Sequence, residues 1–166
     1  LSEVGRDQAL RAGRQLADAG GADLLVVSPM LRARETAELV AQSLSAPIVI
    51  EHDLRECAFG EWDGLTFAEV QASDGVRLAE WLAATSLAPP GGESFDQVSD
   101  RVASARDRLV AEHAGATMVW VTHVTPLKTM VRLALDAPSH SLFRMFVAPA
   151  SLTSIQWFGD GHASVN

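Results

Sequence analysis

Two positions in this chain combine an anion-binding side chain with the start of a predicted helix. His123 follows the apolar run 119–122 and stands just before Thr125 and Pro126, a pair typical of a helix N-terminus. Arg32 follows the apolar run 23–28 and a proline, in the first turn of another helical pattern. Helix N-termini offer free N–H groups and the positive end of the dipole, so both positions favour an anion such as phosphate.

The stretch 54–64 could supply proton transfer next to such an anion. It holds three carboxylates, Glu56, Glu61 and Asp63, among aromatic residues and glycines. A carboxyl group in a partly apolar environment can act as a general acid. The spacing of the three residues does not choose among them.

The same region allows two other hypotheses. His52, Asp53, Glu56 and Asp63 could form a metal cluster, but their spacing matches no recognised ligand pattern. Cys57 could be a nucleophile, but no arginine follows it closely, as a phosphatase thiolate requires. We therefore interpret Cys57 as a small buried hydrophobic residue.

The elements that would position these residues alternate between helix and strand. Helical patterns cover 2–19, 31–44, 76–84, a stretch from Ser94 and a stretch from Thr125; strand patterns cover 23–28, 47–50, 117–122, 143–147 and 152–158. Capping-box patterns mark helix starts at Thr66 and Ser94. The alternation predicts an α/β, three-layer sandwich with a mostly parallel central sheet. If strands 23–28 and 117–122 are neighbours, Arg32 and His123 face one crevice beyond their carboxyl ends.

Composition narrows the function. With 166 residues, we expect a single domain over 1–166, with 65–93 as a lid or inserted region. A net charge of −8 without a basic stripe argues against nucleic-acid binding. No run is long enough to cross a membrane, and a single cysteine fits a reducing cytoplasm. We expect an apolar wall in this region, formed by Trp81, Leu87, Pro89 and Pro90, which favours a bulky substrate.

Five blocks resemble motifs of the phosphoglycerate mutase-like branch of the histidine phosphatase superfamily, in the family's order. They are the helix start at 1–9, SPMLRARETA at 28–37, LRECAFGEWDG at 54–64, GES at 92–94 and VTH at 121–123. The chain is most similar to the acid phosphatase half of actinobacterial ribonuclease H/acid phosphatase fusions, and similar to the α-ribazole phosphatases. The resemblance therefore covers nearly the whole chain.

The resemblance implies a metal-independent acid phosphatase without a cofactor, acting on a small phosphorylated substrate through a phosphohistidine. It assigns phosphoryl binding to Arg32 and His123, stabilisation of the transition state to His123, and leaving-group protonation to Glu56, which selects Glu56 among the three carboxylates. The family's nucleophilic Arg-His-Gly motif is absent from the sequence. We expect it on a strand preceding Leu1, and expect residues 1–166 alone to be inactive.

Two further functions stay open. The missing motif suits a non-catalytic relative that binds a phosphorylated ligand or a protein partner, and the family also contains phosphoglycerate mutases, although a short 65–93 region disfavours the latter. The resemblance further allows a fusion to an N-terminal ribonuclease H domain, and a homodimer.

Overall fold

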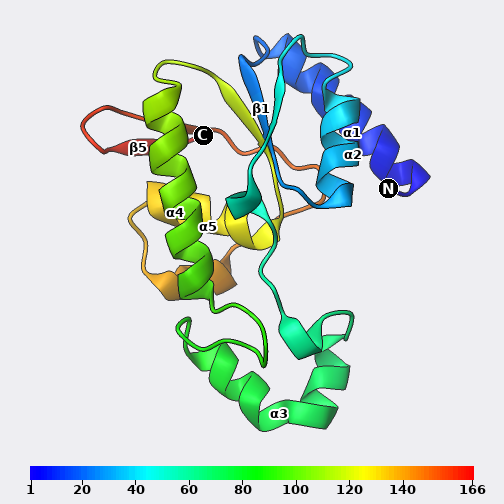
Figure 1. The fold of residues 1–166 in the computed structure, drawn as a ribbon, viewed down its shortest axis with the longest axis vertical. Helices are drawn as coiled ribbons and strands as arrows, with labels where there is room; N and C mark the ends of the chain where they lie inside the picture. The colour runs from blue at the N-terminus through cyan, green and yellow to red at the C-terminus, as the bar shows by residue number, and fades with distance from the viewer.

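The computed structural model describes all 166 residues, and its centre is a three-stranded parallel sheet. Strand β1 (Leu24–Val27) lies between β2 (Ile48–Ile50) and β3 (Met118–Val121) and pairs in parallel with both. All four residues of β1 are buried, as expected for an apolar strand covered on both faces. The predicted neighbours 23–28 and 117–122 are therefore side by side, with their carboxyl ends at one edge of the sheet (Figure 1).

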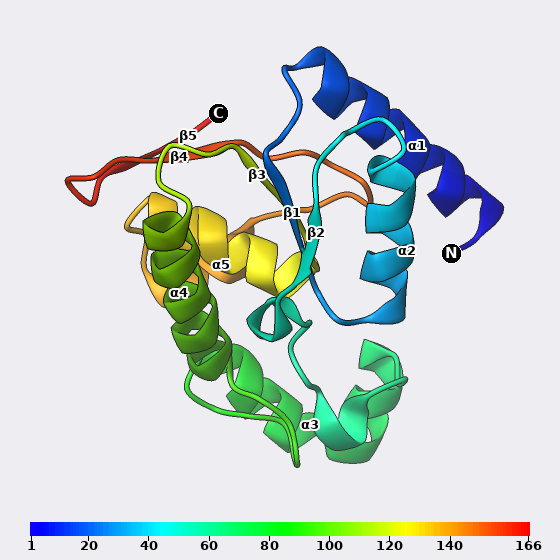
Figure 2. The ribbon, with the colours of Figure 1, turned by 45° about the horizontal axis from the view of Figure 1, so that its top comes forward.

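Helices cover both faces of this sheet, which confirms the predicted three-layer α/β sandwich. Side chains alternate along β1, so Leu25 and Val27 pack on α1 (Glu3–Asp18) and α2 (Leu31–Val40). Leu24 and Val26 point the other way, toward α4 (Phe95–Glu112). Helix α5 (Val124–Ala134) packs against α4 on that second face (Figure 2). Helix α2 follows β1 and helix α5 follows β3, so both helices begin at the edge of the sheet where the carboxyl ends of these strands lie.

The region 65–93 extends away from the sheet, at the end of the molecule where α3 (Phe67–Ala83) lies (Figure 1). The two helices expected there form one helix with a kink at Asp74. Both predicted capping boxes form, at Thr66 and at Ser94. Gly60 adopts a positive φ of 58° where the preceding loop crosses the turn at Pro90, and a Cβ there would come within 2.1 Å of the Pro90 carbonyl oxygen. That crossing joins the region to the body of the protein.

The C-terminal part departs from expectation. The predicted strand 143–147 is wrong: a 3-10 helix, η3 (Ser139–Arg144), starts after Pro138 and the following residues form no ladder. Strand propensity in this stretch is overridden because Phe143 instead stacks edge-on against Phe95, with ring centroids 5.4 Å apart. The predicted strand 152–158 is confirmed in part, since β4 (Ile155–Trp157) forms an antiparallel pair with β5 (Ala163–Val165).

None of the helices combines the length and the apolar character that crossing a membrane requires.

Candidate active site

Arg32 and His123 meet at the carboxyl edge of the sheet. Arg32 is the second residue of α2, which follows β1, and His123 is the N-cap of α5, which follows β3. Arg32 Nε donates a hydrogen bond to His123 Nδ1 over 3.2 Å. Residues 91 positions apart in the sequence are thus brought into contact by the parallel pairing of their strands. No ion pair involves Arg32, so its charge is available to an anion.

The imidazole of His123 is held from its other side by Ser28, the fully buried residue after β1. Ser28 Oγ lies 2.7 Å from His123 Nε2 and accepts a hydrogen bond from the backbone N–H of Met30. Because Nδ1 accepts from Arg32, the proton of the neutral ring is assigned to Nε2, which donates to Ser28. The ring therefore has a fixed orientation and a fixed tautomer.

The surroundings of His123 favour its neutral form. Burial lowers the pKa of His123 to about 4, and the nearby guanidinium of Arg32 acts in the same direction, while Glu56 opposes the shift. An anion bound beside Arg32 would change this balance, because negative charge favours the protonated imidazolium. The site thus contains Arg32, which is always positively charged, next to His123, which becomes positively charged when an anion binds.

We expect His123 to weaken the folded state in acid. Between pH 6.5 and 4 the unfolded chain protonates this residue while the folded chain does not, so stability falls as the pH drops through that window. In His123→Asn, the decrease in unfolding free energy between pH 7 and pH 4 should be smaller than in the unchanged protein. Urea denaturation of the full-length protein at several pH values measures this, and identical decreases would refute it.

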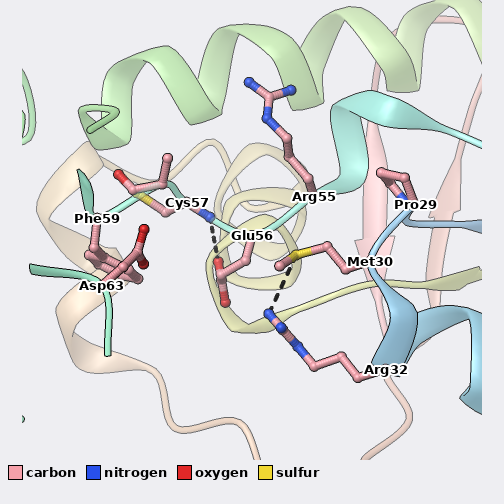
Figure 3. Close-up of a pocket in the computed structure, with 9 residues that line it drawn as sticks. Pro29, Met30, Arg32, Arg55, Glu56, Cys57, Phe59 and Asp63 are labelled. Carbon is pink, nitrogen blue, oxygen red and sulfur yellow. Dashed lines mark hydrogen bonds between the residues drawn. The ribbon is translucent and has the colours of Figure 1, made fainter. Parts of the chain in front are cut away.

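Glu56 borders the site formed by Arg32 and His123. It lies on the loop between η1 (His52–Leu54) and η2 (Gly60–Trp62). Its Oε1 accepts hydrogen bonds from the backbone N–H groups of Cys57, over 2.8 Å, and Thr125, over 3.2 Å. Thr125 is in the first turn of α5, so this carboxylate faces the same helix N-terminus as His123. Glu56 and Arg32 line one cavity of about 500 Å³, seen in Figure 3 with both side chains directed into it.

The other two carboxylates of the stretch 54–64 differ from each other in their relation to this cavity. Asp63 lines the same cavity as Glu56, whereas Glu61 is exposed and does not. No three acidic, histidine or cysteine side chains come close enough to hold a metal ion, so His52, Asp53, Glu56 and Asp63 form no cluster.

Cys57 is 3% exposed, and burial together with the charges of Glu93 and Glu56 raises the pKa of its thiol to about 12. A thiol that stays protonated is a poor nucleophile, which agrees with its interpretation as a buried hydrophobic residue.

A charged pair anchors the backbone on both sides of Glu56. Arg101, on α4, donates to both carboxylate oxygens of Glu93 and to the carbonyl oxygens of Glu56 and Asp53. Glu93 in turn accepts from the backbone N–H of Ala58 over 3.1 Å. Burial acts to raise the pKa of Glu93, but the hydrogen bonds from Arg101 and Ala58 outweigh it and lower that pKa. The pair fixes the loop that carries Glu56 against α4.

Sequence reasoning missed Ser28, Glu93 and Arg101. Ser28 stands inside the block around Arg32, and Glu93 inside the GES block, where the pattern indicated only a helix start. Both blocks could have drawn attention to these residues. Arg101 carries no local signal, because it reaches a loop that lies 45 residues away in the sequence.

Sequence comparison identifies relatives that match nearly the whole of this chain. A family model described as histidine phosphatase superfamily (branch 1) matches residues 1–166. A bifunctional protein of Mycobacterium tuberculosis is 46% identical over 165 residues, covering 99% of this chain and 45% of the relative. A glucosyl-3-phosphoglycerate phosphatase of the same species is 35% identical over 154 residues, 89% of this chain and 66% of the relative. This chain therefore spans about half the length of the mycobacterial relatives to which it is 46% identical.

Solved structures share the fold. YhfR of Bacillus stearothermophilus superposes with a TM-score of 0.90 at 34% identity, over 99% of this chain and 82% of the other. An α-ribazole phosphatase from Shigella flexneri has a TM-score of 0.85 at 24% identity, over 100% and 82% of the two chains, which speaks for the fold alone. The predicted phosphoglycerate mutase-like architecture is confirmed.

Proposed function

The chain belongs to the histidine phosphatase superfamily, and we propose that it forms most of the active site of a phosphomonoesterase that acts on a small phosphorylated metabolite. One observation carries the proposal: the Arg32 guanidinium, which donates a hydrogen bond to His123, lines one cavity together with Glu56. A guanidinium, an imidazole and a carboxyl group suit phosphoryl transfer, which depends mainly on positioning and on charge stabilisation.

Arg32 and His123 bind the phosphoryl oxygens. The planar fork of the guanidinium offers N–H donors that match two oxygens at once. On binding, the contact between Arg32 Nε and His123 Nδ1 opens, and the ring takes up a proton from the solvent so that Nδ1 donates to a phosphoryl oxygen. Ser28 is already placed to accept from Nε2 of the resulting imidazolium. Charge that develops on phosphorus-bound oxygen is then met by two cations.

The nucleophile comes from a histidine on a segment that precedes Leu1, in the family's Arg-His-Gly motif. The outer edge of β3 supports this proposal: β3 is an edge strand that pairs only with β1, and Trp120 on β3 packs in one cluster with Trp157 on β4. A further strand at that edge would bring its residues to the carboxyl end beside His123. The extra length of the relatives and solved structures is compatible with such a segment, and with the proposed fusion to a ribonuclease H domain.

Glu56 moves the protons. In the first step the nucleophilic nitrogen bonds to phosphorus, the bond from phosphorus to the alcohol oxygen breaks, and the Glu56 carboxyl gives its proton to that oxygen. In the second step Glu56 takes a proton from water, whose oxygen attacks phosphorus and breaks the phosphorus–nitrogen bond. The hydrogen bonds from Cys57 and Thr125 hold one oxygen of the carboxylate in place for both steps.

Replacing Glu56 with glutamine tests this assignment through the leaving group. For ethyl phosphate, kcat should fall by about 10²-fold, because ethoxide must be protonated as it leaves. For 2,4-dinitrophenyl phosphate, the first turnover should stay fast and a phosphorylated protein should accumulate, because only the water step needs Glu56. Rapid-quench kinetics of the full-length protein measure both, with Glu61→Gln as the matched control. An equal loss for both esters without a burst would refute the role.

The absent motif also favours a second candidate, a non-catalytic relative that binds a phosphorylated ligand through Arg32 and His123. The residues encoded before Leu1 separate the two candidates. An Arg-His-Gly motif there, together with phosphate release from phosphomonoesters, supports the enzyme. Phosphate binding without turnover in the full-length protein supports the relative.

A further inference from the structure

A second cavity of about 160 Å³ lies next to the one that Arg32 lines, between the loop 59–65 and helix α3. Its lining is mainly apolar, and we name it the aromatic pocket after Phe59, Trp62, Phe67 and Trp81. Phe59 and Asp63 line both cavities, so the two adjoin. A molecule whose phosphoryl group is held by Arg32 can therefore extend into the aromatic pocket.

The aromatic pocket has a tightly packed inner wall at its back and a solvent-exposed mouth at its front. Trp81 packs edge-on against Trp62 and Phe59, with ring centroids 5.8 and 6.1 Å apart, and both tryptophans are buried. At the front, Phe67 is 67% exposed and Leu65 is 47% exposed. Large apolar side chains at the mouth of a cavity are stabilised when an apolar ligand removes them from water. The shape and the chemistry thus favour an apolar group.

Charge around the two cavities disfavours a ligand with a second anionic group. Arg55, the other cation that lines the first cavity, is paired with Glu93 over 2.7 Å, which leaves Arg32 as the unpaired cation. Asp63 stands where the cavities adjoin and would repel a carboxylate or a second phosphate. The available positive charge therefore suffices for one phosphoryl group, and the rest of the substrate meets apolar walls and one carboxylate.

We propose that the aromatic pocket binds an uncharged, apolar leaving group about the size of a phenyl ring. Its volume is close to that of an apolar cavity of about 150 Å³ known to bind benzene. The preferred substrates are then phosphomonoesters of apolar alcohols, rather than those of hydroxy acids or of sugars with a second phosphate. This inference rests on the proposed function for the position of the phosphoryl group. Of the predicted apolar wall, Trp81 lines the pocket, whereas Leu87, Pro89 and Pro90 line neither cavity.

Phosphonates test the aromatic pocket without turnover. By titration calorimetry on the full-length protein, 2-phenylethylphosphonate should bind at least about 10-fold more tightly than ethylphosphonate, a ratio typical of filling an apolar pocket. The anionic 3-phosphonopropionate should bind no more tightly than ethylphosphonate. In Phe67→Ala the preference for the phenyl group should fall toward one while ethylphosphonate binds as before. Val76→Ala is the control, since Val76 is 77% exposed on the same helix and lines neither cavity.

Each outcome separates this inference from the proposed function. Equal affinity for the phenyl and ethyl compounds, tighter binding of 3-phosphonopropionate, or an unchanged preference in Phe67→Ala would overturn the aromatic pocket even if phosphomonoesters are hydrolysed. A phenyl preference that depends on Phe67 supports it even if no ester is hydrolysed. Hydrolysis itself is judged by phosphate release alone.

Discussion

Replacing Arg32 with alanine should lower kcat/KM for phosphomonoesters by about 10³-fold, the loss expected when a cation that stabilises a transferring phosphoryl group is removed. Arg32 is expected to have this effect because no carboxylate pairs with its guanidinium, which donates hydrogen bonds only to His123 and to the sulfur of Met30. Part of the loss should appear in KM, since the same charge binds the ground-state dianion. Steady-state kinetics of the full-length protein provide the measurement.

Arg34 offers a matched control for Arg32. It lies two residues further along the same helix and is exposed, and it lines neither cavity. Arg34→Ala should keep kcat/KM within about twofold, as is usual for a surface change away from the site. If the two variants lose activity equally, or if Arg32→Ala stays active, Arg32 does not bind the phosphoryl group.

His123→Ala should lower kcat by about 10²- to 10³-fold, the range measured for loss of one preorganised donor to a transition-state oxygen. The effect should fall mainly on kcat, because His123 is neutral in the free site and becomes a full donor only as negative charge approaches. Inorganic phosphate should also bind more weakly to the variant at acid pH.

His140, an exposed histidine in η3, provides the control for His123. His140→Ala should retain full activity, and circular dichroism should show both variants folded. Full turnover by a folded His123→Ala protein would remove this residue from the site and, with it, the explanation for the contact with Arg32.

Local patterns predicted the fold well because they depend on residues a few positions apart. The capping boxes at Thr66 and Ser94 need only a partner three residues on, and both form. The apolar run that became β1 needed no knowledge of its neighbours to be recognised as a buried strand. The stretch 143–147 failed because its aromatic residues indicate a strand, whereas the packing of Phe143 on Phe95 depends on a helix that begins almost fifty residues earlier.

The candidate site divides in the same way. Arg32 and His123 could be expected together because both follow apolar strands, and the rule for parallel sheets then places them at one edge. Spacing could not choose Glu56 over Glu61 and Asp63; the family resemblance did. The pair Glu93 and Arg101 could not be predicted, since its hydrogen bonds to the loop 53–58 exist only after α4 has packed against that loop.

A crystal structure of the full-length protein with bound vanadate would test most directly whether Arg32, His123 and Glu56 share one phosphoryl group. Vanadate should lie within hydrogen-bonding distance of the Arg32 guanidinium and of His123 Nδ1, with the Glu56 carboxyl group facing its apical oxygen. Vanadate bound elsewhere, with the contact between Arg32 and His123 intact, would contradict the proposed site.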